Sequence, residues 1–363
     1  MVPAPAPPAP ILVLLGTQPT DPRGGIGVAM AGFIEAARDE GLLHAFVPTY
    51  DPSARGRHWR LAVRAARPMI RAIRAIREAG EQPIIYTHAG SELSVLRETT
   101  LLRLATRAGA RTMIQLHSYR LEHWTHGARA RVLRQVLHVA DSVCVSTERA
   151  RDRLAAVGLR GAVQVVPDPL PSWAEQAART PRAPRRGEGL RVVTMTRLVP
   201  GKGVDLAIAA LRHADPSTTL VVAGDGPEAA ALARAARDLG DRVRFAGWVG
   251  DDDRDRLLRD SDVFLLPTRY DSFGMGFIEA ACFGLPSVAL RWGPIPEVVG
   301  DGRTGLLVDD PDPAALGAAL DRLRDPALRQ RLGDAARRDA LDRFSVAAVG
   351  RAIRAALPDG GTP

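Results

Sequence analysis

Two acidic residues flank a glycine-containing turn in the second half of the chain. Asp271 opens this turn, and Glu279 follows it eight positions later. The apolar run 262–267 before the turn predicts a buried parallel strand, and Gly284 and Pro286 predict where the following helix ends. The free N–H groups and the positive dipole end at the start of such a helix suit a phosphate. Glu279 would then lie at the back of a phosphate pocket, where it could accept hydrogen bonds from two vicinal ribose hydroxyls.

A second loop carries the single lysine of the chain. Lys202 stands in the segment 197–203, which begins with Arg197 and follows the apolar run 191–196. An apolar run, a glycine-containing loop and a new helical pattern predict a strand–loop–helix unit. The loop therefore presents two side-chain cations, and such groups can stabilise negative charge on a phosphate ligand.

These segments, together with the turn Gly224-Asp225-Gly226-Pro227, resemble the motifs of glycosyltransferase family 4, retaining enzymes with the GT-B fold. Asp271 stands where the family's E-x7-E element more usually has its first glutamate. The resemblance implies that Arg197 and Lys202 clamp the departing nucleoside diphosphate, without a metal or another cofactor, and that Asp271 faces the transferred sugar. The donor-binding residues that it implies are Gly224, Gly226, Ser272, Phe273, Gly274, Met275 and Glu279.

The first half of the chain resembles the same family more loosely. After the apolar run 11–15, Gly24 and Gly25 lead into a helical pattern, and such a glycine loop allows close approach of backbone to a ligand. The resemblance implies that these glycines face the donor phosphates and the acceptor. His117 ends a predicted strand and matches a histidine that the family presents to the donor sugar. Asp168 departs from the family pattern, which has asparagine at this corner.

The order of predicted elements indicates an α/β protein, and the resemblance makes it a GT-B enzyme. Its two Rossmann-like, doubly wound domains are expected to face each other across a cleft. The predicted divisions are a flexible N-terminus (1–10), an acceptor-side domain (11–171), a linker (172–190), a donor-side domain (191–343) and a C-terminal helix that returns to the first domain (344–363).

The formal net charge of +8 belongs to the first half of the chain. Residues 1–180 contain 23 arginines and 15 acidic residues, an excess of 8, whereas the remainder contains 26 basic and 26 acidic residues. Six arginines recur there at steps of three and four, which predicts one basic helical face that Pro68 should kink or split. They are Arg57, Arg60, Arg64, Arg67, Arg71 and Arg74.

A basic helical face is typical of contact with an anionic membrane surface, and a solvated face over an ordinary core helix has the same pattern. Nucleic acid is excluded as a partner because aromatic residues are too sparse among the arginines. No run approaches the roughly 18–20 apolar residues that span a membrane. Cys144 and Cys282 lie in apolar runs and are expected to be buried, unpaired thiols. We therefore expect a cytoplasmic protein, either free or peripheral on the inner face of the cytoplasmic membrane.

The preferred interpretation is a retaining hexosyltransferase that uses a UDP- or GDP-linked sugar and a hydroxyl acceptor. A lipid-linked glycan in cell-surface polysaccharide or glycolipid assembly is the candidate acceptor. The motifs leave three alternatives open: glycosylation of a soluble natural product, a sugar-nucleotide 2-epimerase, and a non-catalytic nucleotide-sugar sensor.

Overall fold

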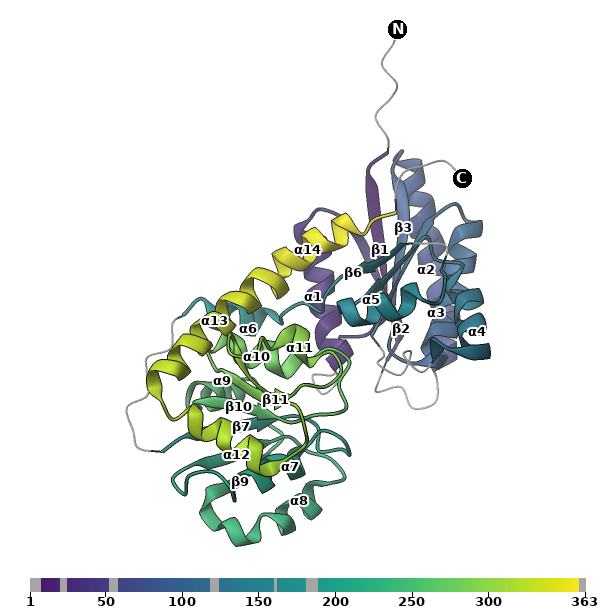
Figure 1. The fold of residues 1–363 in the computed structure, drawn as a ribbon. Coiled ribbons are helices and arrows are strands. Elements are labelled where there is room, and N and C mark those ends of the chain that lie inside the picture. The colour runs from purple at the N-terminus through teal and green to yellow at the C-terminus, as the bar shows by residue number, and fades with distance from the viewer. Residues whose placement is uncertain are drawn as a thin grey trace. The chain divides into compact units, whose positions relative to one another are not determined.

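The structure is a computed structural model that describes residues 8–19, 25–51, 58–117, 124–159, 162–180 and 189–358. The chain divides into two compact units, Met1–Pro171 with Val346–Pro363, and Ser172–Ser345. Each unit is built on one six-stranded sheet whose neighbouring strands run parallel (Figure 1). Parallel strands need crossover helices that cover the sheet, and this gives the α/β architecture that the sequence predicted.

The sheet of the first unit has the strand order β2-β1-β3-β4-β5-β6. Its strands are β1 (Pro10–Thr17), β2 (Leu43–Tyr50), β3 (Gln82–Ala89), β4 (Arg111–Leu116), β5 (Ser142–Val145) and β6 (Ala162–Val165). The apolar run 11–15 forms β1, and the predicted strand that His117 ends is β4. The sequence reading did not identify β2, an edge strand that contains Pro48. Proline is tolerated at a sheet edge, where no neighbour needs its missing N–H group.

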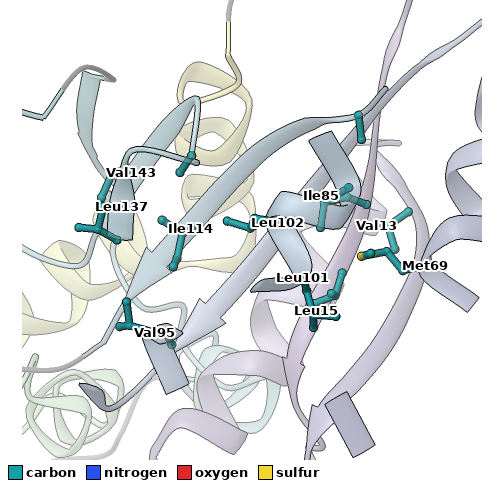
Figure 2. Close-up of a cluster of buried hydrophobic side chains, with 14 of the residues drawn as sticks. Val13, Leu15, Met69, Ile85, Val95, Leu101, Leu102, Ile114, Leu137 and Val143 are labelled. Atoms are coloured by element: carbon teal, nitrogen blue, oxygen red, sulfur yellow. The ribbon is translucent and has the colours of Figure 1, made fainter. Parts of the chain in front are cut away.

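Two hydrophobic clusters cover the two faces of this sheet. The helices are α1 (Gly25–Asp39), α2 (His58–Glu78), α3 (Glu92–Arg107), α4 (Gly127–Leu137), α5 (Glu148–Ala155) and α14 (Val346–Ala355). One cluster contains Met69 of α2 and Leu101 of α3 together with Val13 and Ile85 of the strands, and Leu137 of α4 lies beside Val143 of β5 in the same cluster (Figure 2). The opposite face carries the cluster that α1 and α14 supply.

Helix α2 is continuous through Pro68, so the expectation that proline splits this segment was wrong. One side of α2, including Ala65, Met69 and Ile73, is buried in the core, and the burial of this side supports the helix across the proline. The arginines of α2 lie on its exposed side. Arg57, the first of the predicted set, is outside the described residues.

Helix α14 belongs to the first unit although it comes from the far end of the chain. Val346, Val349 and Ile353 are buried in the cluster that contains Phe33 of α1. Nε of Arg354 lies 2.7 Å from Oε2 of Glu40, which follows α1. The predicted last helix is therefore present, and it begins at Val346, two residues later than expected.

The sheet of the second unit has the strand order β12-β11-β10-β7-β8-β9. Its strands are β7 (Arg191–Met195), β8 (Thr219–Ala223), β9 (Val243–Gly247), β10 (Val263–Leu266), β11 (Ser287–Leu290) and β12 (Gly305–Val308). Its helices are α6 (Ser172–Ala178), α7 (Val204–Ala210), α8 (Ala229–Ala235), the 3-10 helix η2 (Arg237–Arg242), α9 (Asp251–Arg259), α10 (Met275–Cys282), α11 (Ile295–Val298), α12 (Pro313–Arg322) and α13 (Pro326–Phe344).

The segment predicted as a linker begins instead with a helix. Helix α6 buries Ala174 and Ala177, and the ring of Trp173 lies 6.1 Å from that of Phe283, so α6 is part of the second unit. The prolines and arginines after Ala178 led to the prediction that the whole segment is a linker, so this short helix was missed. Cys144 and Cys282 are both buried and unpaired, as expected.

No helix in the described ranges is long and apolar enough to cross a membrane.

Candidate functional site

The second unit has its topological switch point between β7 and β10. These two strands are neighbours in the sheet, while β8 leads away on one side and β11 on the other. In open α/β sheets, ligands bind outside the carboxyl ends of the strands at such a point. The loops that follow β7 and β10 hold Lys202 and Asp271, so the two sequence motifs meet at this crevice although they are far apart in the chain.

Backbone hydrogen bonds tie the two loops together. The carbonyl oxygen of Gly201 accepts from the backbone N–H of Arg269 at 2.9 Å and from the hydroxyl of Thr268 at 3.3 Å. Gly203 has φ +76°, and a Cβ there would overlap the carbonyl oxygen of Pro267. Only glycine permits this approach. The loop glycines around Lys202 therefore serve to join the two loops closely.

Lys202 and Asp271 form an ion pair at the centre of this arrangement. Nζ of Lys202 lies 2.8 Å from Oδ2 of Asp271, and both side chains are largely buried. The ammonium group also lies 5.9 Å from the ring centre of Tyr270, within the range of a cation–π contact. The sequence assigned Lys202 to phosphate and Asp271 to sugar as separate roles. In the structure the two groups neutralise each other.

Arg197 is the uncompensated cation of the site. Its side chain is exposed and has no ion-pair partner among the described residues. The loop that carries Arg197 rests on the turn containing Gly224 and Gly226, where a Cβ would overlap the carbonyl oxygens of Thr196 and Leu198. The backbone N–H of Leu198 donates to the backbone carbonyl oxygen of Asp225 at 2.9 Å. The two glycines, predicted as donor contacts, thus shape the loop that presents Arg197.

The start of α10 offers backbone donors to the same crevice. Its N-cap residue, Gly274, has φ +108° and no side chain to cap the helix. Ser272 is exposed beside it. Phe273, predicted to bind the donor, is only 2% exposed, and its ring lies 5.4 Å from that of Phe344. The side chain of Phe273 therefore packs in the core and anchors the loop there. Only the backbone groups of Phe273 remain available to a ligand.

Glu279 lies inside α10 with an unusual charge environment. Burial raises the pKa of its carboxyl from the ordinary 4.5 to about 7, and the positive charge of Arg254 lowers this pKa in part. Arg254 lies 3.6 Å above the ring of Trp173 and pairs with Asp251 at 3.0 Å. Sequence reasoning missed Arg254 and Trp173 because α9 and α6 bring them to α10 only in the folded unit.

Helix α9 begins with three acidic residues in its first turn. Asp251, Asp252 and Asp253 follow the N-cap residue Gly250, where negative charge favours the helix dipole. Arg256 pairs with Asp253 at 3.3 Å, one turn further along the helix.

In the first unit, His117 is part of a buried polar chain. Its Nε2 lies 3.0 Å from Nδ1 of His88, and its Nδ1 lies 3.1 Å from Oδ1 of Asp168, close enough for an ion pair but not aligned as a hydrogen bond. The hydroxyl of Ser146 donates to the same carboxylate oxygen at 2.8 Å. His88 lies near the end of β3 and His117 directly follows β4, so this polar chain crosses the carboxyl edge of the sheet.

Both ring nitrogens of His117 therefore face other side chains. The carboxylate of Asp168 favours a proton on Nδ1 of His117, which leaves Nε2 to accept from Nδ1–H of His88. Burial, and then the neighbouring His117, lower the pKa of His88 well below its ordinary 6.5. The remaining lone pair is on Nε2 of His88, which has no hydrogen-bond partner among the described residues. A role of the His117 ring at the donor sugar remains a prediction, and in this arrangement neither of its nitrogens is turned to a ligand.

Of the two glycines predicted in the first unit, the structure describes one. Gly25 is the first residue of α1. Gly24 lies outside the described residues.

A family model and several known proteins match this chain. The model of the family described as Glycosyl transferases group 1 matches residues 179–339. The GDP-mannose-dependent alpha-(1-6)-phosphatidylinositol monomannoside mannosyltransferase of Mycolicibacterium smegmatis is 35% identical over 262 residues, 66% of this chain and 68% of that relative. The lipopolysaccharide core biosynthesis glycosyltransferase LpsD of Rhizobium meliloti is 31% identical over 220 residues, 58% of this chain and 62% of that relative.

Solved structures share the fold of the whole chain. Anabaena Alr3699/HepE in complex with UDP has a TM-score of 0.70 at 18% identity and covers 95% of this chain and 98% of its own. The lipopolysaccharide outer core galactosyltransferase WaaB has a TM-score of 0.67 at 16% identity, with 95% and 99% covered. The chain has two doubly wound sheets, carries cationic and acidic loops at a switch point, and is 35% identical to the mannosyltransferase relative. These findings show that it belongs to the glycosyl transferases group 1 family, glycosyltransferases of GT-B fold that act on nucleotide sugars.

Proposed function

We propose that the protein moves a hexose from a nucleoside diphosphate sugar to a hydroxyl acceptor with retention of the anomeric configuration. The observation that carries the proposal is the Lys202–Asp271 ion pair at the switch point of the second unit, with the exposed Arg197 in the same loop as Lys202. One cation already paired and one still free provide a site that a diphosphate can enter by exchanging partners.

Binding of the donor would redistribute these charges. A diphosphate attracts Lys202 and Arg197 more strongly than the single carboxylate of Asp271 does, because it carries more charge and more acceptor oxygens. Its arrival would separate Lys202 from Asp271, and the released carboxylate would be available beside the sugar. The backbone N–H groups at the start of α10, which no side chain caps, would add to the phosphate contacts.

Glu279 would accept hydrogen bonds from the ribose hydroxyls. Only the ionised carboxylate offers acceptors to two vicinal hydroxyls at once. Because the pKa of Glu279 is about 7, the neighbouring charge of Arg254 matters for keeping the carboxylate ionised near neutral pH. Arg254 would therefore act on donor binding through Glu279, as a positioning residue.

The transfer itself breaks the bond between the anomeric carbon and the diphosphate oxygen, which keeps the electron pair. The acceptor oxygen forms the new bond to the same carbon, and its proton passes to the departing diphosphate. Lys202 and Arg197 would stabilise the negative charge that grows on the diphosphate, and Asp271 would stabilise the positive charge that grows on the sugar.

The acceptor is proposed to be membrane-borne, in glycolipid or cell-surface polysaccharide assembly. The names of the relatives refer to a phosphatidylinositol mannoside and to lipopolysaccharide core. Arg60, Arg64, Arg67, Arg71 and Arg74 are exposed along α2, and none pairs with a carboxylate of the described residues. We therefore place the enzyme at the inner face of the cytoplasmic membrane, where anionic lipids attract such a face.

A panel of UDP- and GDP-linked hexoses tests this function. We expect one donor to raise the unfolding temperature, because it binds only the folded state, and to release nucleoside diphosphate when a glycolipid acceptor is added. Proton NMR of the product then reports its anomeric configuration. Conversion of the donor without an acceptor would indicate an epimerase, binding without any turnover would indicate a sensor, and inversion would contradict retention.

A further inference from the structure

Four apolar side chains remain exposed at the beginnings of α2 and α3. Trp59 and Val63 of α2 are 56% and 70% exposed, and Leu93 and Leu96 of α3 are 71% and 47% exposed. We refer to these four residues as the edge patch. The members of each pair are three or four positions apart, so they lie on one side of their helix. The core side of α2 is already buried on the sheet, so the edge patch is not needed for folding.

The topology places both pairs at one edge of the sheet. Helix α2 follows β2 and helix α3 follows β3, so both helices begin at the carboxyl ends of the parallel strands. They cover the same face of the sheet and pack against each other (Figure 1). The edge patch therefore lies at the edge that carries His88 and the start of α1, where the first unit would bind its ligand.

The basic face of α2 starts at the same place. From Arg60 to Arg74 it extends over about 21 Å, at 1.5 Å per residue, and it contains no acidic residue. An occupant that meets both features must offer negative charge over this length and an apolar region at one end. The boundary between headgroups and acyl chains in an anionic bilayer has this combination, and indole and aliphatic side chains partition there.

We propose that the edge patch inserts into an anionic phospholipid bilayer while the arginines of α2 rest on its headgroups. The proposal rests on the membrane-borne acceptor of the proposed function and deepens it. The carboxyl edge of the first sheet would be the part of this unit nearest the bilayer. An acceptor anchored by an acyl chain would then reach the binding edge without leaving the membrane.

Vesicles that contain brominated lipids test insertion directly. With vesicles of phosphatidylcholine and phosphatidylglycerol brominated near the headgroup, we expect tryptophan fluorescence to be quenched in the full-length protein. The quenching should be lost in Trp59→Phe, although that variant should still sediment with the vesicles. Sedimentation with no Trp59-dependent quenching would mean adsorption through charge alone and would overturn insertion.

A pair of matched variants on α3 locates the contact. Leu93→Ser combined with Leu96→Ser should weaken vesicle binding by roughly tenfold, as expected for two half-inserted leucines. Leu104→Ser is the control, because Leu104 lies at the other end of the same helix and is 40% exposed. It should change binding by less than about twofold. Equal effects of both changes, or self-association that the double variant abolishes, would overturn the proposal.

Transfer to a water-soluble methyl glycoside separates this inference from the proposed function. The Leu93/Leu96 variant should release nucleoside diphosphate as fast as the unchanged protein when acceptor and donor are both in solution. A loss in this assay would place the leucines in the binding site and overturn the insertion role. Absence of release in the unchanged protein, with every donor, would contradict the proposed function instead.

Discussion

Lys202 lies against Asp271, and this pairing determines what a substitution there should do. Removing the ammonium group leaves a largely buried carboxylate without its cation and removes a contact to the departing diphosphate. The residue types were identifiable from the sequence, because a lone lysine and an acidic turn follow apolar strands. Their contact was not, since it depends on β7 and β10 being neighbours across 69 positions of sequence. Phe273 shows the opposite error: a residue in a binding loop proved to belong to the core.

Replacement of either site cation should reduce the rate of transfer. We expect Lys202→Ala and Arg197→Ala each to lower turnover by roughly 10²–10³, the scale for one lost contact to developing charge. Arg234→Ala on α8 is the control, an exposed arginine outside the crevice, and should leave turnover unchanged. Steady-state release of nucleoside diphosphate measures all three, and unchanged turnover in Lys202→Ala would contradict the assignment.

Glu279→Gln should stabilise the fold at alkaline pH. The folded state holds the Glu279 proton with a pKa of about 7, above the ordinary 4.5, so ionisation of this carboxyl costs folding free energy. The cost is full above a pH of about 7 and disappears below the ordinary value. We expect a gain on the order of 1–3 kcal/mol near pH 8 that is largely gone near pH 5, measured by denaturant unfolding. The same gain at both pH values would be incompatible with the raised pKa.

The same carboxylate should make donor binding depend on pH. Affinity for the nucleoside diphosphate should fall as the pH is lowered from about 8 to about 6, because the protonated acid loses an acceptor for the ribose. Titration of the diphosphate itself contributes to this dependence, and Glu279→Gln isolates that contribution. If the variant shows the full pH dependence of the unchanged protein, Glu279 is not its source.

At the scale of elements, apolar runs in the sequence predict strands. The loops after these strands need glycine where a Cβ would overlap the backbone of a neighbouring loop. The sequence predicted β7 and β10 because each is a short apolar run that ends in a turn signal. It missed β11, a four-residue strand directly after the end of α10, and α6, whose small apolar face contains mainly alanines. Short elements such as these gain their stability from tertiary packing, which a local pattern does not record.

Gly224 is the element-scale test of how the Arg197 loop is held. Its φ is +137°, and a Cβ would overlap the carbonyl oxygen of Thr196. Gly224→Ala should therefore destabilise the protein by about 2–4 kcal/mol and reduce turnover by displacing the loop. Gly250→Ala is the control, since that glycine has an ordinary φ and open space around its Cβ. The unfolding temperature and the turnover of both variants are measured. If Gly224→Ala is as stable and as active as Gly250→Ala, Gly224 does not hold the Arg197 loop.

At the scale of the whole molecule, the chain returns to its first unit with α14. The excess of positive charge belongs to residues 1–180, which form most of that unit. Sequence reasoning obtained the helix and its destination from family resemblance, because nothing local in the residues 346–355 indicates which sheet they cover. The polar chain Asp168–His117–His88 could not be predicted from the sequence either, because no local pattern indicates that these three residues are in contact. Its members come together only when β3, β4 and the segment after β6 are aligned.

Ending the chain after Ser345 should unfold or strongly destabilise the first unit. Val346, Val349 and Ile353 are buried beside Phe33, and their loss exposes an apolar face of α1. We expect aggregation or a loss of several kcal/mol, on the scale of removing three buried side chains. A chain that ends after Pro358 keeps α14 and is the control. Similar thermal unfolding of the two truncated chains would show that α14 is dispensable.

The central claim is that the crevice between the loops of β7 and β10 binds the nucleoside diphosphate of a sugar donor. Calorimetric titration of the full chain with UDP and with GDP tests it most directly, with Lys202→Ala and Arg234→Ala measured alongside. We predict that one of the two nucleotides binds in a one-to-one complex. We also predict that Lys202→Ala weakens this complex by at least about tenfold, the effect of losing one charge-assisted contact, while Arg234→Ala leaves it unchanged. Binding of neither nucleotide, or equal affinity in Lys202→Ala and the unchanged protein, would contradict the account.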